Sequence, residues 1–233
     1  MKLQSVLVVT VVLLSCPAAA AFGKTTGLVE KGFRLGIDFS TLRGEIATFP
    51  GTTTDPGRRT GVAAGAYLLY AVSPKFGLES ELWYITKGAK YSGSGLVGLA
   101  GTDLVVDSDW TSTAKINSIE SPILLRFAPA ARGSYLVGGA ALAINLGGKL
   151  TTEVSLDRTS YPPGATWSTD ENLKGLPSVE IGAIVGAGLQ IPAGSSKISL
   201  EGRYNVGFSS IDFSSESTDV KSGTFVISAG IGF

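Results

Sequence analysis

Few residues of this sequence could carry acid–base or metal chemistry, because the chain contains no histidine. Histidine is the usual base beside a catalytic serine or cysteine and a common ligand of zinc, so those mechanisms are excluded together. The remaining candidates are carboxylates. Glu79 and Glu81 lie two residues apart, which on a β-strand places them on one face, where a carboxylate pair could transfer protons. We interpret them instead as partners of buried arginines, and we expect no enzymatic activity.

Other acidic residues lie in two stretches rich in Gly, Ser and Thr. The first stretch contains Asp103, Asp107, Asp109 and Trp110, and the second contains Tyr161, Pro162, Pro163, Trp167, Asp170 and Glu171. Carboxylates can bind a divalent cation, but this spacing matches no metal-binding loop. We therefore predict solvated acidic loops without metal or cofactor. The two tryptophans are candidates for partner contacts or for packing within their own loops.

The charges of the chain indicate no polyanionic partner. Lysine and arginine number 19, aspartate and glutamate number 19, and charged residues make up only 16% of the sequence. A balanced chain offers no basic patch for nucleic acid. No glycine-rich loop follows a strand and opens a helix, so nucleotide binding has no support.

The first residues have the composition of an export signal. Lys2 precedes an apolar run over 6–14, and four alanines at 18–21 offer cleavage sites. We predict a signal peptide over 1–21 that is removed, a short lead over 22–30, and one β-barrel domain over 31–233. A lipoprotein cleavage at Cys16 is an alternative, but Leu14 stands where a small residue is usual. Cys16 is the only cysteine, so no disulfide is expected.

Beyond residue 30 the hydrophobic pattern has a period of two, which is typical of β-strands. Phe33, Leu35, Ile37 and Phe39 alternate with polar or small residues. Similar runs cover 61–71, 76–84, 115–127, 134–147, 179–191, 198–207 and 225–233. No later segment is apolar for long enough to form a transmembrane helix. The sequence therefore predicts eight strands.

The connections between these runs alternate in length. Short links at 72–75, 128–133 and 192–196 contain turn formers, and longer links lie near 44–60, 91–113, 148–178 and 209–221. This alternation predicts an all-β, eight-stranded, antiparallel up-and-down transmembrane barrel with short periplasmic turns and long extracellular loops. An even number of strands places both ends of the barrel at the short-turn side.

Aromatic residues indicate which face of the strands meets lipid. We predict a girdle at the short-turn rim, where side chains of the apolar face meet the membrane interface. Its members are Phe33, Tyr70, Phe76, Phe127, Tyr135 and Phe233. Phe39, Tyr84, Tyr204 and Phe225 lie nearer the other rim. The alternative is an exported soluble, lipocalin-like barrel in which the apolar face points inward.

With the apolar face outward, the other face fills the interior of the barrel. The predicted lumen charges are Arg34, Asp38, Glu79, Glu81, Glu120, Arg126, Lys197, Glu201 and Arg203. Eight strands leave an interior about wide enough for side chains, and isolated ions there are costly, so these charges should pair. We favour a salt-bridged plug over an ion path. Pro122 falls on the same face and predicts a bulge or an interrupted ladder.

Four segments stand out in order along the chain. They are Glu81-Leu82-Trp83-Tyr84 with Lys87-Gly88-Ala89-Lys90, then Ile119-Glu120-Ser121-Pro122-Ile123-Leu124-Leu125-Arg126, then Arg203-Tyr204-Asn205-Val206-Gly207, and last Gly230-Ile231-Gly232-Phe233. Together they resemble the PorT-like family of small outer-membrane β-barrel proteins. The likeness covers roughly 31–233 and implies an eight-stranded barrel. The resemblance also implies that the end of the chain is the signal read by the barrel-assembly machinery, formed by Phe225, Ile227, Ala229, Ile231 and Phe233.

These observations predict a non-enzymatic protein of the bacterial outer membrane, with a structural frame and outer loops that bind or shield. The expected partners are outer-membrane lipid, the assembly machinery, and an extracellular ligand at the loops. A small-solute diffusion channel is the alternative function that keeps the same fold.

Overall fold

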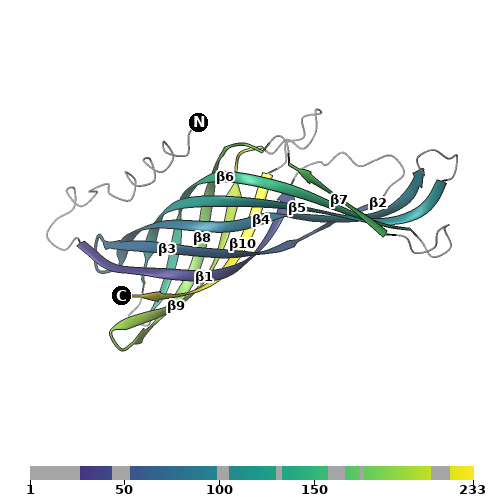
Figure 1. The fold of residues 1–233 in the computed structure, drawn as a ribbon. Helices are drawn as coiled ribbons and strands as arrows, with labels where there is room; N and C mark the ends of the chain where they lie inside the picture. The colour runs from purple at the N-terminus through teal and green to yellow at the C-terminus, as the bar shows by residue number, and fades with distance from the viewer. Residues whose placement is uncertain are drawn as a thin grey trace.

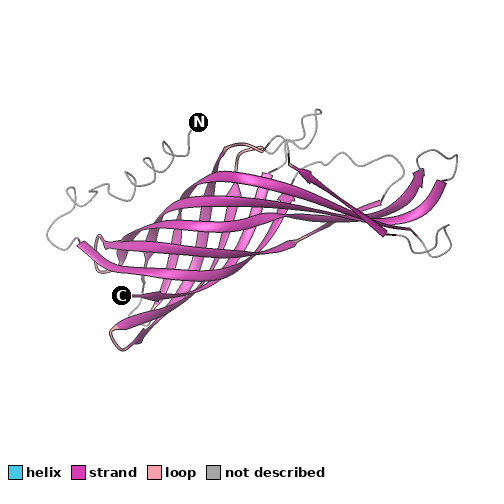
Figure 2. Ribbon diagram, in the orientation of Figure 1, coloured by secondary structure: helices cyan, strands magenta, loops and turns pink. Residues whose placement is uncertain are grey.

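The computed structural model describes residues 27–43, 53–98, 105–129, 133–156, 166–173, 176–210 and 221–233. These residues form β-strands joined by turns and loops (Figures 1 and 2). The strands are β1 (Gly27–Arg43), β2 (Thr53–Gly57), β3 (Arg59–Ala71), β4 (Phe76–Gly98), β5 (Val105–Phe127), β6 (Ser134–Leu156), β7 (Thr166–Asn172), β8 (Val179–Ala193), β9 (Ser196–Gly207) and β10 (Lys221–Gly232). No helix in the described ranges is long and apolar enough to span a membrane.

Eight of the described strands close into a ring. The hydrogen-bonded order runs β4-β3-β1-β10-β9-β8-β6-β5, and the pairing of β4 with β5 completes the circle. The ends of the barrel sequence meet where β1 pairs antiparallel with β10, for example Phe33 with Ile231 and Phe39 with Phe225. The predicted eight-stranded antiparallel barrel is confirmed.

The short links lie where the alternation predicted them. β3 and β4 are joined across 72–75, β5 and β6 across 128–133, and β8 and β9 across the turn at Gly194 and Ser195. The start of β1 and the end of β10 lie at this same end of the barrel (Figure 1). Pro122 interrupts the ladder between β4 and β5, because Ser80 pairs with Ile123 and Trp83 with Glu120 but nothing pairs between them.

Two of the predicted long loops are wrong. The segment 91–113 is mostly strand, since β4 continues to Gly98 and β5 begins at Val105. In the segment 148–178, β6 continues to Leu156 and β7 follows. These extensions are rich in Ser, Thr and Gly and lack a clear apolar alternation, so their sequence is typical of loops. Backbone hydrogen bonds propagated from the barrel strands hold them in the sheet.

The outward face of the ring is apolar and exposed. Leu35 is 70% exposed and Val185 is 63% exposed, and many large aliphatic side chains of the ring share this orientation. Charged side chains in the middle of the same strands, such as Arg34, Glu81 and Arg203, point inward and are buried. A soluble, lipocalin-like barrel requires the reverse arrangement. An apolar outer surface of this extent fits the acyl chains of a bilayer and not water.

The predicted signal peptide over 1–21 lies outside the described residues. Of the predicted lead over 22–30, only the last residues are described, and they form the beginning of β1.

Candidate functional site

The centre of the lumen holds a cluster of three arginines and three glutamates. Nη1 of Arg34 lies 2.5 Å from Oε1 of Glu79 and also contacts Glu81. Nη1 of Arg203 lies 2.5 Å from Oε2 of Glu81, and Nη1 of Arg126 lies 3.2 Å from Oε2 of Glu79. The sixth member is Glu201, whose Oε2 lies 3.5 Å from Nη1 of Arg34. Equal numbers of opposite charges cancel, so this cluster presents no field that selects ions.

Each of the three arginines is also stacked on an aromatic ring. The guanidinium carbon of Arg34 lies 4.2 Å from the ring centre of Tyr67, and that of Arg126 lies 3.6 Å from the ring centre of Tyr135. The guanidinium of Arg203 lies 4.3 Å from the ring of Trp83. Such contacts stabilise a cation further where water is excluded.

Glycines on neighbouring strands make room for these rings. A Cβ atom added at Gly65 would lie 2.5 Å from Cδ2 of Trp83, and one added at Gly188 would overlap the ring of Tyr135. The lumen is therefore packed with large side chains seated over small ones, as in a protein core.

The inner end of the lumen is sealed around Glu30. Its Oε1 accepts hydrogen bonds from the hydroxyl of Tyr67 and from Nε2 of Gln190, both at 2.6 Å. Its Oε2 lies 2.7 Å from Nζ of Lys197, whose side chain is about half exposed at the rim. A buried carboxylate with three donors is well satisfied.

A second charged cluster lies nearer the outer end. Nζ of Lys87 donates to Oε2 of Glu180 at 2.7 Å and to Oε1 of Glu120 at 3.2 Å. Nδ2 of Asn205 also donates to Glu120, and the hydroxyl of Ser222 donates to Glu180. The cavity beside these side chains measures about 20 Å³. That volume accommodates about one water molecule and not a solute.

Apolar side chains close the lumen beyond this cluster. Leu42, Ala89 and Ile116 are buried together, and Leu173 and Leu176 pack against them. The interior thus passes from a satisfied carboxylate through two charged clusters to an apolar contact at the outer end.

The structure places the predicted lumen residues as follows. Arg34, Asp38, Glu79, Glu81, Glu120, Arg126, Glu201 and Arg203 are buried on the inward face, and Lys197 lies half exposed at the inner rim. Asp38 departs from the expected pairing, because neither of its carboxylate oxygens has a hydrogen-bond partner in the described part of the chain. Three charged lumen residues went unpredicted: Glu30, Lys87 and Glu180. Lys87 and Glu180 follow the alternation of Glu81 and Gly182, so extending the period of two along each strand identifies both. Glu30 has the same parity as Arg34 and lies just before residue 31, where the barrel was predicted to begin.

Tyr135 corrects the predicted aromatic girdle. Its side chain is buried, donates a hydrogen bond to Oε2 of Glu201 at 3.0 Å, and lies under Arg126. The outward residue beside it is Leu136, which is 51% exposed. The Tyr135 ring points into the lumen because of its place in the strand alternation, although the residue lies near the rim.

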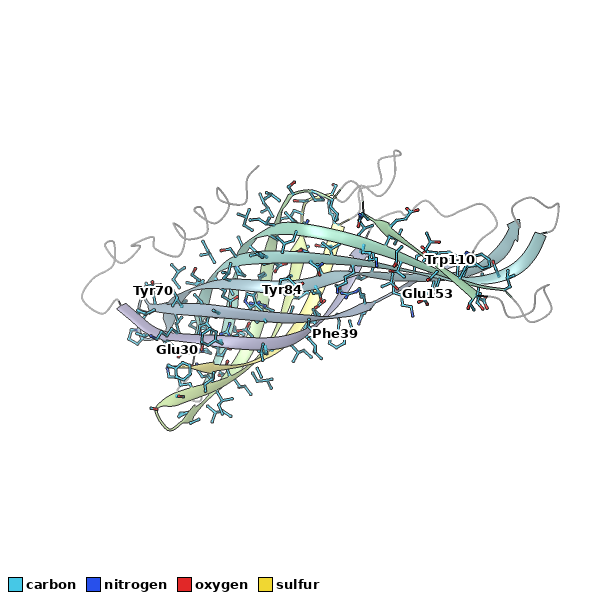
Figure 3. The ribbon with its side chains drawn as sticks, viewed as in Figure 1. Glu30, Phe39, Tyr70, Tyr84, Trp110 and Glu153 are labelled. Atoms are coloured by element: carbon cyan, nitrogen blue, oxygen red, sulfur yellow. The ribbon has the colours of Figure 1, made fainter. Side chains whose placement is uncertain are left out.

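The other girdle residues lie toward the short-turn end. Phe33, Phe76 and Phe233 are exposed, and Tyr70 and Phe127 are partly exposed. The rings of Phe76 and Phe127 stack with their centres 4.8 Å apart. Figure 3 shows Tyr70 at this end of the barrel and Phe39 nearer the opposite end.

The last strand presents its apolar residues outward. Phe225, Ile227, Ala229, Ile231 and Phe233 are all exposed. The backbone of Phe233 exchanges two hydrogen bonds with Lys31 of β1, so the end of the chain completes the seam of the barrel.

Beyond the outer end of the ring, part of the sheet continues as a projecting arm (Figure 1). The arm consists of β2, β7 and the segments 90–98 of β4, 105–115 of β5 and 149–156 of β6, in the order β2-β4-β5-β6-β7. Figure 3 shows Trp110 and Glu153 on this arm, away from the ring.

The two faces of the arm differ in charge, as strand alternation assigns their side chains. The face continuous with the lipid side of the barrel carries Lys90, Asp109, Lys115, Lys149, Glu153 and Asp170. Nζ of Lys149 lies 2.8 Å from Oδ2 of Asp170, and the hydroxyl of Thr151 donates to Oδ1 at 2.7 Å. These hydrogen bonds, first that from Lys149, lower the pKa of Asp170 below its ordinary value. Charged side chains on this face indicate that the arm lies outside the bilayer.

The acidic residues predicted to lie in solvated loops belong partly to this arm. Asp109, Asp170 and Glu171 are exposed on strands and not in loops. Asp103 and the segment 161–163 lie outside the described residues, as does the side chain of Asp107. In the described part of the chain, no group of three or more acidic or cysteine side chains is arranged to hold a metal ion.

Comparison with known proteins identifies one family. The model of the outer membrane protein beta-barrel domain matches residues 22–212. No curated protein matches the chain.

Solved structures similar to the chain include three outer-membrane proteins. Ail of Yersinia pestis is 18% identical over 89% of this chain and 100% of its own, with a TM-score of 0.39. Neisserial surface protein A is 12% identical over 87% and 95%, with a TM-score of 0.38. The outer membrane protease OmpT of Escherichia coli is 9% identical over 93% and 99%, with a TM-score of 0.37.

Proposed function

Because the chain belongs to the family of outer membrane protein beta-barrel domains and lies in the bacterial outer membrane, we propose that it is a sealed, non-enzymatic barrel that presents a binding arm outside the cell. The barrel anchors and orients the arm, and the arm meets the ligand. The finer likeness to the PorT-like family is part of this proposal.

The observation that carries the proposal is the length of three neighbouring strands. β4, β5 and β6 each contain 23 residues, whereas β9 and β10 each contain 12. A membrane-crossing strand needs about 9–11 residues. At about 3.3 Å per residue, the extra length of each long strand carries it roughly 35 Å farther than β9 or β10. Strands of 23 residues are longer than a membrane crossing requires, so the extra length extends beyond the bilayer.

The interior supports the same division of roles. The central ion pairs, the Lys87 cluster and the apolar contact at Leu42 fill the lumen, so a diffusion channel has no support in the described residues. The lack of histidine supports a non-enzymatic role. We also propose that the outward apolar residues of β10, ending at Phe233, are the segment read by the barrel-assembly machinery.

Protease treatment of intact cells tests the exposure of the arm. A cleavage sequence inserted in the link 157–165 should be cut from outside, whereas the same sequence in the turn at Gly194 should resist until the outer membrane is opened. Protection of the 157–165 site in intact cells would contradict the proposal.

A shortened variant tests whether the barrel supports the arm and not the reverse. Replacing 91–112 and 150–171 by short turns should leave an assembled barrel whose mobility on gels still changes with heating. Loss of assembly in this variant, with wild type assembled in parallel, would show that the arm is part of the barrel's own stability.

A further inference from the structure

One row of side chains crosses three strands of the arm. Trp110 of β5 pairs with Val154 of β6, and Val154 pairs with Trp167 of β7. Neighbouring strands lie about 4.8 Å apart, so the two tryptophans leave the same face at positions roughly 10 Å apart, with Val154 between them. Trp167 is 40% exposed. Trp110 and Trp167 therefore lie on the same face of the arm, outside the membrane.

A pocket of about 490 Å³ lies at the same level of the arm. Most of its lining residues, among them Asp109, Glu153 and Ser168, alternate to the opposite face, so the pocket is not a feature of the tryptophan face alone.

The rest of this face supplies hydroxyl groups. In the next row toward the barrel, Ser112 pairs with Thr152 and Thr152 with Thr169. The hydroxyls of Ser112 and Thr152 lie 2.9 Å apart. Tyr91 precedes them on β4, paired with Ser112. Hydroxyls beside aromatic rings can both donate and accept hydrogen bonds.

The charge of this face excludes several kinds of ligand. Among its described side chains the only carboxylate is Glu171, and there is no lysine or arginine. Nucleic acid and sulfated or phosphorylated sugars require cationic contacts, which this face lacks. An organic cation would need a carboxylate beside the rings, and Glu171 stands four residues along β7 from Trp167. A lipid surface would require aliphatic side chains where serine and threonine stand.

We propose that this face binds an uncharged saccharide chain, with sugar rings packed on Trp110 and Trp167 and sugar hydroxyls bonded to the row of Ser112, Thr152 and Thr169. A pyranose ring has apolar C–H faces and a polar edge, and the combination of indoles, hydroxyls and missing charge complements both. The inference rests on the proposed function of the arm and names its ligand class.

Tryptophan emission of the purified full chain tests the proposal. The sequence contains three tryptophans, and Trp83 is buried in the lumen, so a ligand on the arm changes only Trp110 and Trp167. The protein is held in amine-oxide micelles, whose headgroups carry no sugar. The uncharged probes are maltohexaose, cellohexaose and chitohexaose, and the charged probes are sucrose octasulfate and choline. We expect a saturable change with at least one uncharged chain and none with either charged probe.

Variants assign the response to the row. Trp110→Ala and Trp167→Ala should each weaken binding about tenfold, because each removes one aromatic contact. Lys90→Gln is the control: it changes an exposed side chain on the opposite face of the arm that does not line the pocket, and it should bind as wild type does. Heat-modifiable mobility on gels checks that each variant is assembled.

Two outcomes overturn the proposal. The first is no response to any uncharged chain at its solubility limit. The second is equal or stronger binding of a charged probe. Either result leaves the proposed exposure of the arm intact, because that exposure is judged by protease cleavage on cells. Protection of the arm from protease would instead overturn the proposed function first.

Discussion

The barrel and its arm share strands β4, β5 and β6, but they distribute charged and apolar residues in opposite ways between the two faces of the sheet. Inside the ring, Glu79 and Glu81 on β4 are buried among arginines while Leu78 and Leu82 face outward. Beyond the ring, the outward face of the same sheet carries charges such as Lys90 and Glu153, and the continuation of the lumen face carries Trp110 and Trp167. The surroundings change from lipid to water along a single strand, and the sequence changes its faces at the same point.

The comparison teaches where function can reside. Each of the six charged groups in the central cluster forms an ion pair with another member, so its removal should affect stability. The arm has few buried ion pairs, because its charged residues are exposed and its tryptophans lie on an open face. Substitutions in the barrel should therefore be costly, and matched substitutions in the arm should not.

The largest effect should follow removal of a central arginine. Arg34→Met leaves Glu79, Glu81 and Glu201 buried without one of their cationic partners. Breaking a buried ion pair in this way costs about 3–5 kcal/mol of the free energy of unfolding. Denaturant unfolding of the protein in lipid vesicles measures it. Lys149→Met in the arm is the control and should change little, since its ion pair with Asp170 is half exposed. If Arg34→Met and Lys149→Met lowered the free energy of unfolding equally, the proposed difference between barrel and arm would be wrong.

A charge placed on the lipid face should have the next largest effect. Leu35→Arg puts a guanidinium at a position that is 70% exposed to the bilayer. We expect a loss of about 2–4 kcal/mol near the middle of the membrane. Ser168→Arg introduces the same side chain on the exposed strand β7 and should be nearly neutral in the same unfolding measurement. A neutral Leu35→Arg would mean that this surface does not meet lipid.

Overpacking of the lumen should have a smaller effect. Gly65→Ala drives a methyl group against Trp83, whose ring is held by Arg203, and should cost about 1–3 kcal/mol. Gly138→Ala is the matched control, since the nearest atom to an added Cβ there is the carbonyl oxygen of Ile184 at 3.8 Å. If the two substitutions were equivalent, the lumen would be looser than described.

The smallest effect concerns the pH response of β7. The hydrogen bonds from Lys149 and Thr151 lower the pKa of Asp170, so they stabilise β7 above its ordinary pKa. That contribution is lost as the pH falls through the lowered value. Carbon NMR should find the carboxylate titrating below 3.8, its ordinary value. Asp170→Asn should speed hydrogen exchange in β7 at neutral pH and leave β1 unchanged. If the Asp170 carboxylate titrated at or above the ordinary value, the hydrogen bonds from Lys149 and Thr151 would not stabilise β7.

Sequence patterns predicted the ring well because one face of each strand must be apolar. The run from Phe33 to Phe39 alternates strictly, since lipid accepts only one kind of residue. The turn at 72–75 was likewise predictable, because Ser73 and Pro74 favour a turn between two such runs.

The arm was not predictable from the same signal. Its strands have no lipid on either side, so residues such as Ser92 and Thr113 suit a strand and a loop equally. Their order depends on pairing between segments distant in the sequence, for example Thr113 with Lys90 and Thr151. Tyr135 shows the other limit, because an aromatic ring near a rim fits an interface and a packed lumen alike until the register is known.

The central claim is that the barrel is a plug and not a path for solutes. Planar lipid bilayers test it most directly, using purified wild-type protein whose assembly is verified by its mobility on gels before and after heating. The account predicts no steady conductance at high protein load. Reproducible open-channel steps from the assembled wild-type barrel would contradict it.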